Sequence, residues 1–86
     1  MVFDDIHPVA PVHFLIVPKL HIASLAECDT SHGSLLADML LLAPRLARQK
    51  GLDSGFRTMI NTGPGGGQEI FHLHVHVFGG GPLKHL

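Results

Sequence analysis

The feature that most constrains the fold is an alternation of histidine and apolar residues near the C-terminal end of the chain. The range 71–78 reads Phe-His-Leu-His-Val-His-Val-Phe, which places three histidines at every second position. Successive side chains of an extended strand point to opposite faces, so the three imidazoles would share one face and the aliphatic residues would line the other. The alternative is a half-buried strand with histidine at its polar positions by chance, which the low abundance of histidine in most proteins disfavours. The pattern therefore predicts a strand over 71–78 with one face in the core and one face available for chemistry.

The chain as a whole is short and apolar. It has 86 residues, of which 45% are hydrophobic and 15% are charged, so residues 1–86 form one domain at most, with a marginal core. A domain this small with so few charged residues leaves an apolar surface, which favours an oligomer. We expect a homodimer. The formal net charge is −1 and the six lysines and arginines are dispersed, which argues against binding to a nucleic acid backbone.

The cellular location is inferred from cysteine content and from hydropathy. Cys28 is the single cysteine, so there is no disulfide framework and no cysteine-pair zinc site, which is typical of a reducing compartment. No apolar stretch is long enough to span a bilayer, and the first residues do not form a signal peptide. We therefore expect a cytoplasmic protein with no membrane partner.

Regular structure elsewhere is predicted by apolar spacing and by proline and glycine. Residues 12–17 are rich in β-branched and aromatic side chains and are followed by Pro18, which predicts a strand that is apolar on both faces and therefore central in its sheet. Residues 34–50 carry apolar side chains at spacings of three and four and are followed by Gly51, which predicts a helix. A further strand is expected over 56–61.

The order of these elements predicts the architecture. With one further short strand expected before the helix, the order is strand, strand, helix, strand, loop and histidine strand. This order favours an α+β fold in two layers, with an antiparallel sheet and one main helix packed on its apolar face. Pro44 is expected to kink the helix, and Leu41 lies off its main apolar face. Because this wide apolar arc implies a second contact surface, a subunit interface is expected there.

A glycine-rich loop directly precedes the histidine strand. Residues 62–68 read Thr-Gly-Pro-Gly-Gly-Gly-Gln, and such a run can expose backbone N–H groups that bind an anion. The run matches neither the P-loop nor the dinucleotide fingerprint, so on its own it is better explained as a flexible hairpin loop. Its position before the histidines favours a role in anion binding.

Two chemistries suit histidines on a strand. Neutral imidazoles are good zinc ligands and two histidines two positions apart can share one ion, but a third on the same strand lies too far away. Asp5 or His13 would then complete the ligand set. Alternatively, an imidazole with one nitrogen held by a hydrogen bond presents the other nitrogen as a nucleophile towards phosphorus. The central His74 is the best-placed attacker, with His72 and His76 beside it, and this chemistry also uses the glycine loop.

Three separated blocks of the sequence resemble the histidine-triad (HIT) nucleotide-binding proteins. They are the histidine block 72–78, the block 61–69 (Asn-Thr-Gly-Pro-Gly-Gly-Gly-Gln-Glu), and the block 3–22, which contains Phe-Asp-Asp-Ile-His-Pro and Pro-Val-His-Phe-Leu-Ile-Val-Pro. The blocks agree with the family in order and spacing, and the resemblance is strongest to the bacterial members of its HINT branch. It implies a HIT-like two-layer fold.

The resemblance also implies an activity and a site. HINT proteins are homodimeric, purine nucleotide-binding hydrolases that need no cofactor and cleave nucleoside 5′-phosphoramidates, such as adenosine 5′-monophosphoramidate, to the nucleotide and an amine. His74 matches the nucleophile that forms a nucleotidyl-histidine intermediate, and His72 matches the histidine that orients it. His76 matches a histidine that contacts the phosphate, and His13 matches one that buttresses the site. The residues that match nucleotide-binding positions are Asp5 for the ribose hydroxyls, Phe3, Ile6 and Leu15 around the base, and Asn61, Gly67, Gln68 and Glu69 on the phosphate side.

The chain departs from the family pattern in two places. Family members begin with a further segment, including an Ile-Phe-Cys-Lys-like strand and a short helix, and this chain starts after it, so part of the base pocket and one sheet edge are expected to be missing. Glu69 stands where many eukaryotic members have a serine that assists the leaving amine, and an unperturbed glutamate is ionised at neutral pH. A nucleotide-binding or regulatory module without catalysis is therefore the second hypothesis, and a histidine-ligated metal protein is the third.

The remaining polar residues receive structural interpretations. His7 and His21 are expected in a turn or at the edge of a pocket, and His32 and His85 in solvent. Thr30 or Ser31 is the expected N-cap of the helix.

Overall fold

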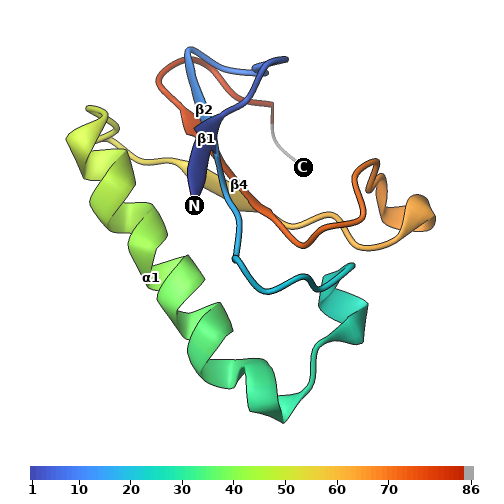
Figure 1. The fold of residues 1–86 in the computed structure, drawn as a ribbon. Coiled ribbons are helices and arrows are strands. Elements are labelled where there is room, and N and C mark those ends of the chain that lie inside the picture. Colours follow the sequence, from blue (N-terminus) through green and yellow to red (C-terminus); the bar gives the residue numbers. More distant parts are fainter. Residues whose placement is uncertain (85–86) are drawn as a thin grey trace.

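The computed structural model of the protein describes residues 1–84 and shows one helix covering one face of a four-stranded antiparallel sheet (Figure 1). The elements in chain order are β1 (Val2–Asp4), β2 (Val12–Ile16), α1 (Gly33–Gln49), β3 (Arg57–Met59) and β4 (Val75–Gly79), with short 3-10 turns at Leu25–Glu27, Thr30–His32 and Pro64–Gly66. The predicted two-layer α+β architecture is confirmed. The predicted solvent position of His85 falls outside the described residues.

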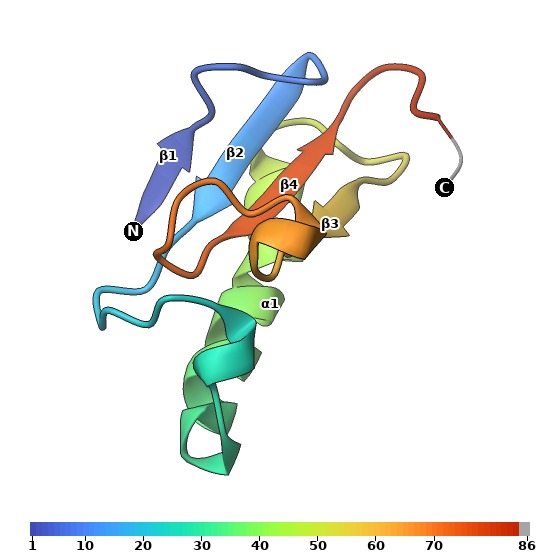
Figure 2. The same ribbon diagram turned by 90° about the vertical axis from the view of Figure 1, so that its right-hand side faces the viewer.

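The sheet has the strand order β1-β2-β4-β3, with β2 and β4 in the centre (Figure 2). This confirms the central position predicted for residues 12–17. Residues directly opposite on neighbouring antiparallel strands share a face. Leu15 of β2 lies opposite both Phe3 of β1 and His76 of β4, and Met59 of β3 lies opposite His76 from the other side. One row of side chains therefore crosses the whole sheet on the face that carries His76.

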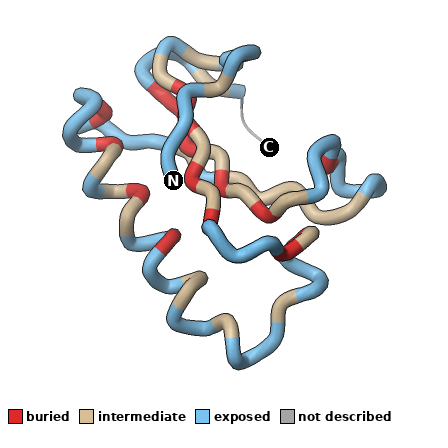
Figure 3. The backbone as a smooth tube through the Cα atoms, viewed as in Figure 1, coloured by how far each residue is buried: buried red, intermediate tan, exposed pale blue. Residues whose placement is uncertain are grey.

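The other face of the sheet forms the core with α1. The largest fully buried side chains come from β2, from β4 and from the residues just before β4, namely Phe14, Ile16, Leu73, Val75 and Val77. The helix contributes Met39, Ala43 and Ala47. Figure 3 shows buried positions along the sheet and on the side of α1 that faces it. Each buried aliphatic side chain contributes about 1.5–3 kcal/mol, so the core fixes which alternate side chains of β4 point away from the helix.

The histidine strand is shorter than the sequence predicts. β4 begins at Val75 instead of at the predicted residue 71, so two of the three histidines precede it. The cause is the partner strand: β2 ends at Ile16, opposite Val75, and Pro18 has no N–H with which to continue the ladder. Before β4 the chain is held differently, by the Leu73 N–H, which donates to the Ile22 carbonyl at 2.7 Å.

The helix begins and ends within one residue of its predicted bounds. Gly51 adopts a φ of +81° directly after it, as expected for a glycine that terminates a helix. The predicted N-cap at Thr30 or Ser31 is wrong, because Asp29 instead caps a 3-10 turn that leads into α1. His32 closes that cap by accepting the Asp29 N–H at 3.0 Å. The predicted solvent position of His32 is therefore also wrong, since its side chain is only 21% exposed.

The outer side of α1 keeps apolar residues in solvent. Pro44 lies inside the helix without ending it, and Leu40 and Leu41 are 46% and 72% exposed. These residues match the second apolar surface that the sequence predicts, although a second subunit there stays a prediction. Among residues 1–84, no helix has the length and apolar character needed to cross a membrane.

Candidate functional site

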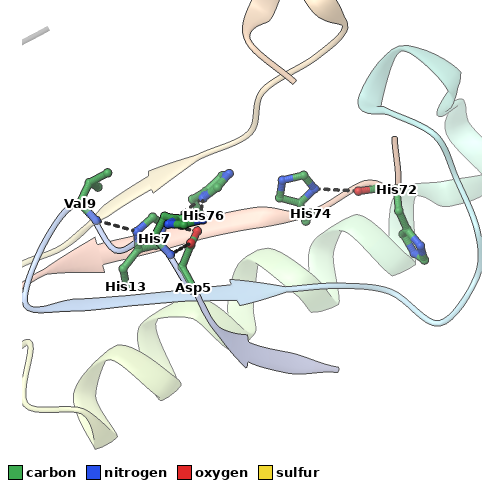
Figure 4. A network of polar contacts seen from close by, with 7 residues as sticks. All are labelled: Asp5, His7, Val9, His13, His72, His74 and His76. Atoms are coloured by element: carbon green, nitrogen blue, oxygen red, sulfur yellow. Dashed lines mark hydrogen bonds and ion pairs between the residues drawn. The ribbon is translucent and has the colours of Figure 1, made fainter. Parts of the chain in front are cut away.

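Three histidines and one aspartate gather on the face of the sheet opposite α1 (Figure 4). His13 comes from β2, His76 from β4, His74 from the residue before β4, and Asp5 from the residue after β1. The ring centroid of His76 lies 4.9 Å from that of His74 and 5.2 Å from that of His13. Because Val75 and Val77 are held in the core, the histidines on either side of Val75 point out on this face.

The hydrogen bond made by His74 determines which of its ring nitrogens is free. Nδ1 of His74 lies 2.7 Å from the carbonyl oxygen of His72. A carbonyl oxygen can only accept, so Nδ1 carries the proton and donates it. In a neutral imidazole the other nitrogen then has the free lone pair. In that neutral form, Nε2 of His74 is the nitrogen available as a nucleophile, and it belongs to a half-buried side chain.

A chain of hydrogen bonds also orients His13 and His76. The Val9 N–H donates to Nδ1 of His13 at 3.1 Å, so the proton of neutral His13 is on Nε2. That Nε2–H faces Nδ1 of His76 at 2.9 Å. His76 therefore accepts at Nδ1 and carries its own proton on Nε2, as a donor.

The surroundings of His76 keep it neutral at pH 7. Burial lowers the pKa of His76 below its ordinary value of 6.5, and the positive charges that His74 and His13 gain on protonation lower it further. The Asp5 carboxylate opposes this shift. The direction of the shift agrees with the role of Nδ1 as an acceptor.

Asp5 faces the same pair of histidines. Its Oδ1 accepts the His7 N–H at 2.8 Å, and its Oδ2 lies 3.3 Å from Nε2 of His13 and 3.8 Å from Nδ1 of His76. The three side chains, referred to below as the Asp5–His13–His76 group, offer one ligand atom each within 4.8 Å of one another. His7 lies in the turn that the sequence predicts, and its backbone orients the carboxylate.

His72 does not join the other two histidines of the alternating stretch, so the prediction that three imidazoles share one face is wrong. Its Nε2–H donates to the Pro18 carbonyl at 2.9 Å, and its ring packs edge-on against His21 at a centroid distance of 4.9 Å. Figure 4 shows its ring turned away from His74. What His72 supplies to His74 is its backbone carbonyl.

The glycine loop is anchored by a buried glutamine. The loop contains the 3-10 turn Pro64–Gly66, flanked by Gly63 and Gly67 at φ +70° and +82°. Gln68 is 5% exposed. Its Oε1 accepts the Gly63 N–H at 2.8 Å, and its Nε2 donates to the carbonyls of Ala23 and Ile70 at 2.7 and 3.0 Å. These bonds use the side chain to hold the loop in place, whereas the resemblance assigns Gln68 to the nucleotide.

The other predicted phosphate-side residues belong to this loop or flank it, and they make no hydrogen bond to the histidines among the residues that the structure describes. Asn61 is half-buried, and Gly67 and Glu69 are exposed. None of the hydrogen bonds and ion pairs among residues 1–84 joins Asn61 or Glu69 to a histidine. A ligand between the loop and the sheet would be needed to bring them into one site.

The predicted base-side residues separate into two groups. Phe3 and Leu15 are directly opposite each other in the sheet, and Leu15 is opposite His76, so an apolar surface continues from the histidines to the sheet edge. Phe3 is 49% exposed and thus available for a planar ligand. Ile6 lies beyond β1 and is 86% exposed. Met59, on the opposite side of His76, belongs to the same row and was not predicted, although alternation along β3 could have indicated it.

Comparison with known proteins establishes the family. A family model described as the HIT domain matches residues 1–83. The chain belongs to the HIT family. Protein HitA of Neisseria gonorrhoeae is 53% identical to it over 77 residues, which is 90% of this chain and 72% of that protein.

Solved structures of HIT proteins have the same fold. A HIT family hydrolase from Legionella pneumophila is 43% identical, with a TM-score of 0.94 over 96% of this chain and 75% of its own. A histidine triad protein from Clostridium difficile is 38% identical, with a TM-score of 0.94 over 99% of this chain and 75% of its own. Family and fold together indicate a hydrolase-like protein.

Proposed function

We propose that this chain binds a purine nucleotide and hydrolyses nucleoside 5′-phosphoramidates through a nucleotidyl-histidine intermediate on His74. The observation that carries the proposal is the 2.7 Å hydrogen bond from Nδ1 of His74 to the His72 carbonyl. In the neutral ring it leaves the lone pair on Nε2, and it stabilises the positive charge that the ring gains on attack. The resemblance to the HINT branch supplies the substrate class.

The arrangement of the face suggests how a substrate is held. The base would lie on the surface formed by Phe3 and Leu15, next to Asp5, which would accept hydrogen bonds from the ribose hydroxyls. The α-phosphorus would then lie above His74. The Nε2–H of His76 is oriented to donate to a non-bridging phosphate oxygen, because its Nδ1 is already engaged by His13.

The reaction would proceed in two displacements at phosphorus. Nε2 of His74 forms a bond to phosphorus as the bond from phosphorus to the leaving nitrogen breaks, and the departing amine takes a proton from solvent. A water molecule then attacks the same phosphorus, and the bond to His74 breaks. The nucleotide leaves, neutral His74 is restored, and the proton lost by the water returns to solvent.

The test replaces His74 with alanine and follows amine release from adenosine 5′-monophosphoramidate. We expect turnover to fall by several orders of magnitude, because the covalent route is lost, while AMP binding stays measurable by calorimetry. His76→Ala should reduce turnover by about 10²–10³, as for the loss of one oriented donor. Retained turnover in His74→Ala would refute the proposal.

A matched control is His7→Ala. The side chain of His7 is exposed, and the interaction with Asp5 comes from its backbone N–H, which alanine keeps. Its turnover should equal that of the wild type. AMP binding without hydrolysis in the wild-type chain would instead support the alternative, a nucleotide-binding or regulatory module. The observation in favour of this alternative is that Glu69 is exposed and makes no hydrogen bond to a histidine among the described residues.

We also propose that the protein is a cytoplasmic homodimer. The exposed leucines on α1 support a subunit interface, and the free thiol of Cys28 fits a reducing compartment. A monomeric mass by light scattering at micromolar concentration would refute the dimer.

A further inference from the structure

We propose that a cavity at the end of the sheet, where β3 begins and β4 ends, binds the phosphate group of a small ligand, with Arg57 as its anchor. The cavity has a volume of about 600 Å³ and lies between the segments 51–57 and 79–83, which Figure 2 shows at the same end of the sheet. Its lining includes no residue of the Asp5–His13–His76 group and none of the glycine loop 62–68. The site is therefore separate from the proposed nucleotide site.

Arg57 brings a positive charge to this cavity with no carboxylate to balance it. Its side chain is half-buried, and its guanidinium carbon lies 6.0 Å from the centroid of the Phe78 ring. Among residues 1–84, no carboxylate oxygen lies within 4.0 Å of an Arg57 nitrogen, and the lining of the cavity contains no acidic side chain. A guanidinium stays charged in proteins. A partly buried one without an acidic partner therefore favours an anionic ligand.

Phe78 determines where this charge lies relative to the histidines. Its ring belongs to β4, between His13 of β2 and Arg57 of β3. The His13 ring packs against it at a centroid distance of 5.1 Å, and the guanidinium lies over it from the other strand. The ring thus separates Arg57 from the catalytic face of His76, which explains why Arg57 makes no contact with the carboxylate of Asp5.

A second set of donors comes from the backbone directly after β4. The ladder ends at Gly79, opposite Val12, and Gly80 follows with a φ of +91°. Among the described residues, the N–H groups of Gly80 and Gly81 donate to no backbone carbonyl, and both residues line the cavity. Glycine places no side chain between such N–H groups and a ligand, and successive free N–H groups are a common anion site.

The wall of the cavity consists mainly of backbone because the chain segments approach each other closely there. A Cβ atom on Gly79 would lie 3.2 Å from the Gly55 carbonyl oxygen, and one on Gly81 would lie 3.2 Å from Pro11. Gly55 itself has a φ of +139°, which residues with side chains rarely adopt. The glycines after β4 are therefore required by this packing, and they do more than end the strand.

These donors suit a tetrahedral oxyanion. The planar fork of a guanidinium binds two oxygens of one phosphate in parallel, and the N–H groups of Gly80 and Gly81 would serve its other oxygens. The hydroxyl of Ser54, which also lines the cavity, adds a donor. A carboxylate has two oxygens in one plane and would leave one set of donors without a partner. The volume is in the range of small-molecule sites, so the cavity has room for the remainder of a phosphorylated ligand.

The experiment follows the backbone amide NMR signals of the 86-residue chain during titration with inorganic phosphate at constant ionic strength. The signals of Gly80 and Gly81 should shift and saturate. Arg57→Gln should weaken this binding by at least about tenfold, because the charge-assisted pair is lost. Arg57→Lys should weaken it less, because lysine keeps the charge and loses the fork. Acetate should bind more weakly than phosphate.

The matched control is Arg45→Gln, which removes the same charge from an exposed position on α1 and should leave the shifts of Gly80 and Gly81 unchanged. If Arg57→Gln gives no folded spectrum, Arg57→Lys carries the test. The same affinity in the wild type and in the folded Arg57 variants would overturn the proposal. So would the absence of saturable shifts at Gly80 and Gly81 in the wild type, and acetate binding as tight as that of phosphate.

The same titration distinguishes this site from the proposed nucleotide site. Phosphate bound beside His74 would shift the signals of the glycine loop 62–68, and Arg57→Gln should leave those shifts and the turnover by His74 unchanged. The two proposals fail separately. Loss of turnover in the wild type would leave the shifts at Gly80 and Gly81 intact, and loss of those shifts would leave turnover intact.

Discussion

Gln68 provides the sharpest test of how the site is held, because structure and family resemblance assign it different roles. Its amide makes three hydrogen bonds to the backbone of three different residues, at 2.7 to 3.0 Å, and only 5% of the residue is exposed. A hydrogen bond contributes a net of about 1 kcal/mol, and buried groups that lose their partner cost more. Gln68→Ala should therefore lower the free energy of unfolding by about 2–4 kcal/mol.

The same geometry predicts that a substitution of nearly the same shape, Gln68→Glu, destabilises the protein more than the truncation to alanine. Gln68→Glu has nearly the same shape and keeps an oxygen for the Gly63 N–H, but it replaces the NH₂ group that serves Ala23 and Ile70. A buried carboxylate would then face two carbonyl oxygens, and an uncompensated buried charge costs more than a lost neutral hydrogen bond. We expect Gln68→Glu to be less stable than Gln68→Ala at pH 7.

Chemical denaturation of the three proteins measures these differences, and Glu69→Gln is the matched control. Glu69 is the next residue and is exposed, so its substitution should change stability by less than about 0.5 kcal/mol. If Gln68→Ala has the stability of the wild type and binds AMP more weakly, the side chain serves the ligand and the structural role is refuted. If Gln68→Ala is destabilised and the protein that remains folded binds AMP normally, the structural role stands.

Three further predictions concern the core, the pH dependence and the helix surface. Leu73→Ala, at a side chain that is 1% exposed, should lower the free energy of unfolding by about 2–5 kcal/mol in chemical denaturation; a loss below about 1 kcal/mol would contradict the packing. The pKa of His76 is lower in the folded protein than the ordinary 6.5, so between those values the unfolded chain binds more protons. The contribution of neutral His76 to the free energy of unfolding should therefore be fully present above pH 6.5 and should decline as the pH falls towards the folded pKa. His76→Gln should weaken this decline. Leu41→Glu, at a side chain that is 72% exposed, should give a monomer in light scattering without loss of helical circular dichroism, and an unchanged dimer mass would place the interface elsewhere.

The parts of the fold that the sequence predicts well are those with a strong local pattern. The spacing of apolar residues and Gly51 located α1 to within a residue, and the unbroken apolar run over 12–17 indicated a central strand, which β2 is. The start of β4 was wrong because the alternation continues past the point where a partner strand exists. A pattern of period two reports which side chains are buried, and Leu73 is buried outside the strand, so alternation alone cannot locate the strand boundary.

The site was predicted in its residue types and less well in its grouping. Sequence reasoning selected His74 as the attacker, and the structure gives its Nε2 a free lone pair. It did not predict that the Val9 N–H, the His7 N–H and the His72 carbonyl determine the orientation of the side chains. Every residue except proline carries both an N–H and a carbonyl in its backbone, so these groups leave no signal in the sequence.

The three alternating histidines differ in position because their side chains are oriented by different neighbours. His76 belongs to a paired strand, so the register of that strand sets the face on which its side chain lies. The same register places His76 opposite Leu15 of β2, two residues along β2 from His13, and so within reach of the His13 ring to which it hydrogen bonds. His74 is flanked by two core residues, which fix its face, and a local backbone bond fixes its tautomer. His72 has a core residue on one side only, because Phe71 is 49% exposed, and its ring instead bonds to Pro18. A histidine in such a stretch is therefore directed to the site only where the residues on both sides of it are held in the core.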